Sequence, residues 1–180
     1  MQQPARTFGL EMILLHWIVA VAMVAVVVYG LISGYAETAE ETQSAMVVHQ
    51  SIGMAILILA VVRVIVRLRR PAPPLPPGMP RYQKVAAAAT HGLLYFTLFA
   101  FPITGYVALA ARGRTVSIFG LFDLPNIVPR NLSLAADADN LHITAQWALY
   151  GLVILHVVAA LYHQFIVKDG VLLRMWPARK

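Results

Sequence analysis

The sequence has no cysteine, and only 12% of its 180 residues are charged, about half the share of an ordinary soluble domain. Without cysteine there are no disulfides, no thiolate sites for zinc or iron–sulfur clusters, and no Cys-x-x-Cys-His attachment of a covalent haem. Six histidines are left as the strong nitrogen ligands. The low charge, together with 59% hydrophobic residues and a mean hydropathy of +0.71, predicts an integral membrane protein.

Four long apolar segments account for most of this hydropathy, at about residues 9–33, 45–68, 85–111 and 141–167. Each is long enough to cross the hydrocarbon core of a bilayer, which takes about 20 apolar helical residues. The predicted fold class is therefore all-α, an integral membrane four-helix bundle that forms one transmembrane domain over residues 1–180. The first segment is longer than the apolar region of a signal peptide, so we expect it to be retained.

The charged residues are distributed unevenly between the links. Residues 34–44 include three glutamates and no basic residue, whereas residues 69–84 include three arginines and one lysine and no acid. Because basic links stay in the cytoplasm, we expect both termini there, in a multi-pass membrane protein. The same rule explains the net charge of +6 by topology, with membrane lipid and not nucleic acid as the partner.

Two links have compositions that predict their structure. Residues 71–80 include six prolines, which exclude a helix and favour an extended connector. The link 112–140 is far longer than the median of about 4–6 residues, and such long loops are usually functional or disordered. Within it, residues 117–122 are apolar enough that we expect a short helix in the membrane interface.

All six histidines lie inside or at the edge of the apolar segments, where an ionisable residue is costly and is by default a functional candidate. His142 and His156 are fourteen residues apart, which places them on nearly one helix face and about 21 Å apart along the axis. Depth within the segments pairs His49 with His142 near the outer face. It leaves His156 as an inner ligand whose partner is either His16 or His91.

Two imidazoles from facing helices in an apolar, cysteine-free bundle predict a non-covalent haem with bis-His ligation, a coordination that favours electron transfer. Zinc would need a tetrahedral cluster with more ligands at one depth. A proton relay usually includes carboxylates within the membrane, and only Glu11, at the very start of a segment, is available. We therefore expect two haem sites.

Three further residues are candidates for contacts with the cofactor. Gly30 and Gly105 each lie fourteen residues after a histidine, at the opposite haem level, where a glycine lets a porphyrin approach the backbone. Ordinary packing of small residues between helices is the alternative. Arg63 lies fourteen residues after His49 and is a candidate partner for a haem propionate, or it extends toward the cytoplasm together with Arg67.

Short motifs in order along the whole chain resemble those of the bacterial cytochrome b561 proteins, which are four-helix dihaem membrane cytochromes. They include Leu15-His16-Trp17, Thr90-His91-Gly92, Pro102-Ile103-Thr104-Gly105, Leu155-His156 and Lys168-Asp169-Gly170. Within the family, the sequence is most similar to the subgroup that contains superoxide oxidase, a superoxide:ubiquinone oxidoreductase. The resemblance implies two haem b groups, with His16 and His156 as the inner ligands and His49 and His142 as the outer ligands.

The same resemblance makes His91 and His163 candidates for a ubiquinone site or for support of the haems. His163, at the membrane interface, can donate a hydrogen bond to a quinone and can supply a proton. The implied activity is an enzymatic transfer of electrons from a periplasmic one-electron donor, expected to be superoxide, to ubiquinone.

The outer link holds the basic residues that would steer the superoxide anion, namely Arg112, Arg114 and Arg130. Three aspartates in the same link cancel their formal charge, so contacts with phospholipid headgroups are the alternative role. Two other functions compete with the oxidase. One is a cytochrome b anchoring subunit that passes electrons from a hydrogenase or dehydrogenase partner protein to quinone, and the other is a haem-free transporter or structural protein.

Overall fold

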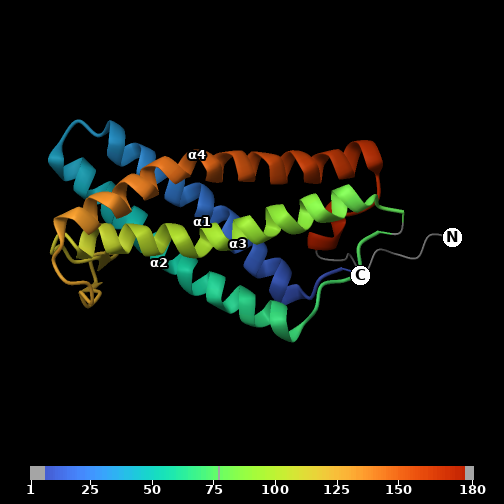
Figure 1. The fold of residues 1–180 in the computed structure, drawn as a ribbon, viewed down its shortest axis with the longest axis horizontal. Helices are drawn as coiled ribbons and strands as arrows, with labels where there is room; N and C mark the ends of the chain where they lie inside the picture. Colours follow the sequence, from blue (N-terminus) through green and yellow to red (C-terminus); the bar gives the residue numbers. More distant parts are fainter. Residues whose placement is uncertain (1–6, 77, 177–180) are drawn as a thin grey trace.

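Four long helices run along one another in the computed structural model, which describes residues 7–76 and 78–176 (Figure 1). They are α1 (Leu10–Tyr35), α2 (Ala39–Arg69), α3 (Arg81–Ala110) and α4 (Leu132–Tyr162). Each is long and apolar enough to cross a membrane, with the last apolar stretch continuing to Val167. The predicted all-α four-helix bundle is confirmed.

Helices α2 and α4 begin before their apolar segments because polar caps, and not hydropathy, decide where these two helices begin. Thr38 and Glu41 form a reciprocal capping box at the start of α2. At the start of α4, the Asn131 side chain accepts a hydrogen bond from the backbone N–H of Leu134. The link expected over residues 112–140 is therefore shorter than predicted, since its second part is the first turns of α4.

A small β hairpin, and not the expected interfacial helix, occupies residues 117–123. Strand β1 (Ser117–Ile118) pairs antiparallel with β2 (Phe122–Asp123). Phe119 and Gly120 turn the chain with φ values of 50° and 70°, which a helix does not allow. The buried hydroxyl of Ser51 on α2 accepts a hydrogen bond from the Phe119 N–H at 2.7 Å and so fixes the hairpin to the bundle.

At the opposite end, three distant segments meet. The Pro-rich link is not helical, as predicted, and α4 continues into a π-helical turn, η1 (His163–Val167), and a 3-10 helix, η2 (Leu172–Met175). The guanidinium of buried Arg174 donates a hydrogen bond to the Pro73 carbonyl, and the backbone carbonyl of Arg174 accepts one from the Phe8 N–H. The Trp17 indole N–H donates to the Met175 carbonyl at 2.8 Å. Figure 1 shows this end and the hairpin end at opposite extremes of the bundle.

The packing divides the bundle into two helical hairpins, α1 with α2 and α3 with α4, joined mainly through α2 and α3. A small buried core of Val19, Ile56, Ala60 and Leu98 lies where α1, α2 and α3 meet. Many large apolar side chains along the four helices are exposed, as a lipid-facing surface requires. Helices α1 and α4 pack on their hairpin partners and hardly on each other.

Candidate functional site

His49 on α2 and His142 on α4 face each other near the hairpin end, with ring centroids 6.1 Å apart. Nδ1 of His49 lies 2.8 Å from the Val26 carbonyl oxygen on α1, and Nδ1 of His142 lies 3.1 Å from the Phe101 carbonyl oxygen on α3. Because a carbonyl only accepts, Nδ1 carries the hydrogen in both rings. Nε2 is therefore the nitrogen that keeps a free lone pair in each.

The spacing of this pair fits one metal ion between two axial imidazoles. A ligating imidazole has its centroid about 3 Å from the metal, given a metal–nitrogen bond of about 2 Å, so two opposed rings lie about 6 Å apart. Among the described residues no group of three or more histidine, cysteine or acidic side chains could hold a bare metal ion. A site with only two imidazoles suits a metal whose other ligands come from a porphyrin.

The two candidate glycines lie against these two rings. A Cβ at Gly30 would lie 3.0 Å from Nδ1 of His49, and a Cβ at Gly105 would lie 3.4 Å from Cε1 of His142. Both glycines are therefore at the outer level, where the sequence analysis placed them. Their nearest neighbour in that direction is the imidazole, so the missing side chain gives the ring its space.

A cavity of about 350 Å³ lies between the four helices at this level. Its walls include both outer histidines and both glycines, and they are otherwise mainly apolar, with Met23, Val26, Phe101 and Leu149 among them. Sites for small molecules and cofactors have this character, at roughly 300–1,000 Å³. Arg112, just after the end of α3, and Asp139, two turns into α4, also line the cavity, so its mainly apolar walls include one acidic and one basic side chain.

Three histidines gather at the inner level. The ring centroids of His16 on α1 and His156 on α4 are 6.1 Å apart, the same spacing as in the outer pair. His91 on α3 lies closer to His156, at 5.4 Å. The structure thus brings together all the inner histidines that depth alone could not separate. The spacing suited to two axial ligands is that of His16 with His156.

Arg63 is buried beside this inner cluster, with 8% of its surface exposed. Its guanidinium lies over the Tyr95 ring at 5.4 Å, and Nη2 is 3.5 Å from Nδ1 of His16. Its Nε is buried and has no hydrogen-bond partner in the described part of the chain. A buried cation that lacks an anion is costly, so this position suits an anionic group such as a haem propionate.

His163 lies outside the inner histidine cluster. It is two turns beyond His156, about 10 Å further along the helix axis. It begins the π turn η1, and its Nδ1 lies 2.6 Å from Oδ2 of Asp169. Sequence reasoning quoted Asp169 only within a family motif. The spacing of Asp169 from His163 is the signal that could have identified it. Residues six apart lie on different faces of a continuous helix, so this aspartate can contact the histidine only if the helix ends between them.

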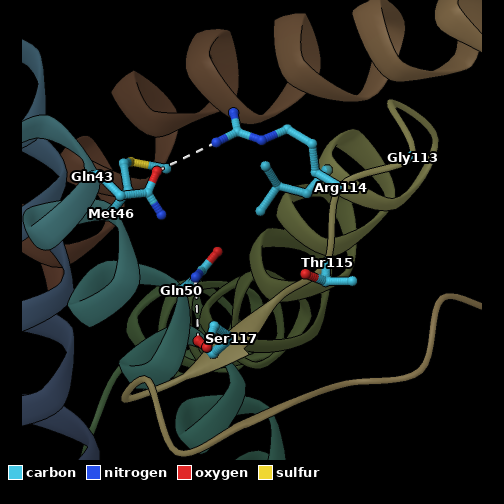
Figure 2. A pocket seen from close by; sticks show the side chains of 8 residues that line it. Gln43, Met46, Gln50, Gly113, Arg114, Thr115 and Ser117 are labelled. Carbon is cyan, nitrogen blue, oxygen red and sulfur yellow. Dashed lines mark hydrogen bonds between the residues drawn. The ribbon is translucent and has the colours of Figure 1, made fainter. Parts of the chain in front are cut away.

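The three outer arginines do not form one cluster. Arg112 donates to Oδ2 of Asp139 at 2.9 Å and is largely neutralised by that carboxylate. Arg114 borders a second, polar cavity of about 360 Å³ and reaches the side-chain oxygen of Gln43 at 3.4 Å (Figure 2). Arg130 is exposed, and its Cδ lies 3.9 Å from the position of a Cβ at Gly113.

Gln50 is a polar residue that the sequence analysis missed. It lines both outer cavities, and its amide donates a hydrogen bond to the Ser117 carbonyl at 3.2 Å (Figure 2). Its position directly after His49 is the signal that could have identified it. Gln50 thus links the polar pocket beside Arg114 to the cavity that contains the outer histidines.

Comparisons with known proteins show the family to which the chain belongs. Residues 7–178 match the sequence model described as prokaryotic cytochrome b561. Cytochrome b561 homolog 2 of Escherichia coli (strain K12) is 34% identical over 176 residues, covering 93% of this chain and 90% of the relative. Homolog 1 of the same organism is 33% identical, with 96% and 98% covered.

A third relative, the probable superoxide oxidase CybB of Yersinia pestis, is 31% identical over 166 residues, covering 92% of this chain and 93% of the relative. All three similarities extend over nearly the full length of both chains. The chain therefore belongs to the prokaryotic cytochrome b561 family, as a multi-pass oxidoreductase of the bacterial inner membrane that carries b-type haem and transfers electrons.

Proposed function

We propose that the chain holds two b-type haems, each between two histidines, and transfers electrons from periplasmic superoxide to ubiquinone. The observation that carries the proposal is the repetition of one spacing, since His49–His142 and His16–His156 both have ring centroids 6.1 Å apart. The two pairs lie about 21 Å apart along α4, at two depths of one membrane. The printed name of the Yersinia relative, a probable superoxide oxidase, supports the choice of donor.

The chain supplies rigid ligands at the outer level. The Val26 and Phe101 carbonyls fix the two outer rings and make Nε2 more basic, as hydrogen-bonded ligand histidines are in other metalloproteins. Ligation of each haem by two histidines would favour electron transfer over oxygen binding. When bound, the haems supply one-electron transfer between the two levels of the bundle.

At the inner level, Arg63 is the residue that would bind a propionate. The Arg63 guanidinium can only donate, and it faces Nδ1 of His16. Nδ1 therefore accepts, and the hydrogen of the neutral His16 ring is on Nε2. With the guanidinium bound to a propionate, Nδ1 of His16 could carry the ring hydrogen, and Nε2 would then be available for ligation. The orphaned Nε of Arg63 supports this role. His91, beside His156, and His163, nearer the inner face, are the proposed quinone-side residues.

At the outer face, Arg114 is the proposed cation for attracting superoxide, because Arg112 is already paired with Asp139. Two superoxide anions each lose one electron and become dioxygen, while one ubiquinone gains two electrons and two protons and becomes ubiquinol. The proposed orientation has both termini in the cytoplasm. It is supported by the glutamate-containing link between α1 and α2, which lies at the hairpin end, away from the arginine-rich link.

A turnover assay tests the donor and the acceptor. Purified protein in detergent is mixed with a ubiquinone analogue and a steady superoxide source, and ubiquinol formation and superoxide consumption are followed together. We expect ubiquinol to form rapidly, with two superoxide anions consumed per quinone reduced. A rate no greater than the uncatalysed reaction would reject the oxidase function, and a copurifying hydrogenase or dehydrogenase would then support the anchoring-subunit alternative.

A further inference from the structure

The last span ends in a π turn and a left-handed residue, and neither contributes a residue to the proposed haem sites. Helix α4 widens into the π turn η1, and Lys168 then adopts a left-handed conformation with φ of 57°. The Lys168 N–H closes the turn on the His163 carbonyl at 2.7 Å. Single π turns are rare and frequently mark functional sites, and a lysine at positive φ persists only where its surroundings impose it.

This turn brings Asp169 back onto His163. Oδ2 of Asp169 lies 2.6 Å from Nδ1 of His163, and both side chains are mostly buried, with 13% and 16% of their surfaces exposed. Oδ1 of the same carboxylate accepts a hydrogen bond from the Val171 N–H at 3.1 Å. The backbone therefore fixes one carboxylate oxygen while the other oxygen fixes the imidazole.

No neighbouring charged side chain in the described residues takes the place of His163 as the partner of Asp169. Of the elements that pack on the π turn, η2 contributes buried Arg174 and α4 contributes Tyr162, whose ring centroid is 5.8 Å from that of His163. Burial and the nearby Arg67 lower the pKa of Arg174, while Asp169 opposes this. Arg174 nevertheless donates its hydrogen bond to the Pro73 carbonyl, and among the described residues the side chain within hydrogen-bond distance of the Asp169 carboxylate is His163.

We propose that Asp169 is a positioning residue for quinone reduction, holding His163 so that Nε2 carries the proton delivered to a quinone carbonyl oxygen. The inference rests on the proposed function. In the step, the Nε2–H bond breaks and an O–H bond forms on a quinone that receives its electrons from the donor. Water at the inner face then returns a proton to Nε2, and the second proton follows by the same route. Asp169 holds Nδ1–H throughout and does not contact the quinone.

The experiment isolates the quinone half of the reaction. The protein is reduced anaerobically with a chemical reductant, mixed with a ubiquinone analogue, and reoxidation is followed by absorbance. This readout requires no superoxide, so failure of the donor assignment does not affect it. We expect Asp169→Ala and His163→Ala each to slow reoxidation about a hundredfold, the lower end of the range for loss of a placed proton donor. The exposed acid variant Glu40→Ala is the control and should reoxidise at the wild-type rate.

The double variant distinguishes positioning from general support of the fold. If Asp169 acts through His163, then His163→Ala and the double His163→Ala/Asp169→Ala variant have equal rates and coincident pH profiles. Asp169→Asn, whose amide oxygen can still accept from Nδ1–H, should recover most of the rate. Unchanged reoxidation in Asp169→Ala would overturn the proposal, and so would additive effects in the double variant. Loss of the haem spectrum or of thermal stability in Asp169→Asn would assign the residue a structural role instead.

Discussion

At the scale of single residues, the outer histidines differ from ordinary buried histidines in the fixed role of Nδ1. The sequence was sufficient to pair His49 with His142 by depth. It could not identify the carbonyls of Val26 and Phe101, because those acceptors are backbone atoms of two other helices. The pairing of the two imidazoles was therefore predictable, whereas the backbone contacts that select their tautomer were not.

Removing one outer imidazole should remove one haem. We expect His142→Ala to bind about one haem per chain, because a single axial histidine holds the cofactor weakly in an apolar site. Haem content and the reduced-minus-oxidised spectrum measure this outcome. Trp147→Ala, at a strongly exposed position of the same helix, is the control and should keep the wild-type content. Two haems with unaltered bands in His142→Ala would contradict the outer ligand pair.

The glycine beside His49 should not tolerate one additional carbon. In Gly30→Ala the new Cβ would lie 3.0 Å from Nδ1, so the ring must move and lengthen its bond to the Val26 carbonyl. We expect a changed midpoint potential or spectrum for the outer haem. Gly34→Ala on the same helix meets nothing within 4 Å and should instead be neutral or gain up to about 1 kcal/mol. Identical haem properties in both variants would show that the glycine does not control the ring.

Arg114 should matter to the donor more than Arg112 does. We expect Arg114→Gln to lower the second-order rate of haem reduction by superoxide several-fold at low ionic strength, because steering of a small anion depends on unpaired positive charge. The difference from the wild type should shrink as salt is added. The double variant Arg112→Gln/Asp139→Asn removes a pair that is already neutral, so its effect on this rate should be smaller. The opposite order in a stopped-flow measurement would reassign the attracting residue.

At the scale of elements, hydropathy predicted four spans and missed their ends. Apolar runs identify the part of a helix immersed in lipid, whereas Thr38 and Asn131 decide where α2 and α4 begin in water. The hairpin was predicted as a helix for a related reason. A short apolar stretch has no reliable periodicity, and here the turn at Phe119 and Gly120 decides the outcome.

The hairpin should depend on one hydroxyl of α2. Ser51→Ala removes the acceptor of the Phe119 N–H in a part-buried hydrogen bond, at a cost of about 1 kcal/mol. We expect faster hydrogen exchange at the Phe119 amide and earlier proteolysis in the hairpin, with haem content unchanged. Ser44→Ala, at an exposed position of the same helix, is the matched control. Equal exchange in both variants would show that other contacts hold the hairpin.

At the scale of the whole molecule, the weak packing between α1 and α4 predicts that bound haem helps to hold the two helical hairpins together. These two helices carry His16 and His156, yet each packs mainly on its own hairpin partner. The four spans and the levels at which the histidines meet were predictable from hydropathy and spacing, since both depend on the thickness of the bilayer. The division into two hairpins depends on side-chain packing between helices, which a single sequence does not disclose.

Haem removal should therefore loosen the two hairpins. We expect protein produced under haem limitation to be cleaved faster by protease and to melt at a lower temperature, because a ligand bound only to the folded state stabilises it. Reconstitution with haem should restore both properties. An apoprotein as resistant as the haem-loaded protein would show that helix packing alone holds the bundle together.

Helix α4 also has a consequence for biogenesis. His142 and His156 both belong to this helix, so the outer and the inner pair each lack one member until it is in place. It is the last of the four spans to leave the ribosome, because synthesis runs from the amino terminus. If the two pairs hold haem as proposed, haem loading is a step of maturation that follows insertion of the fourth span, and both sites become available at the same moment.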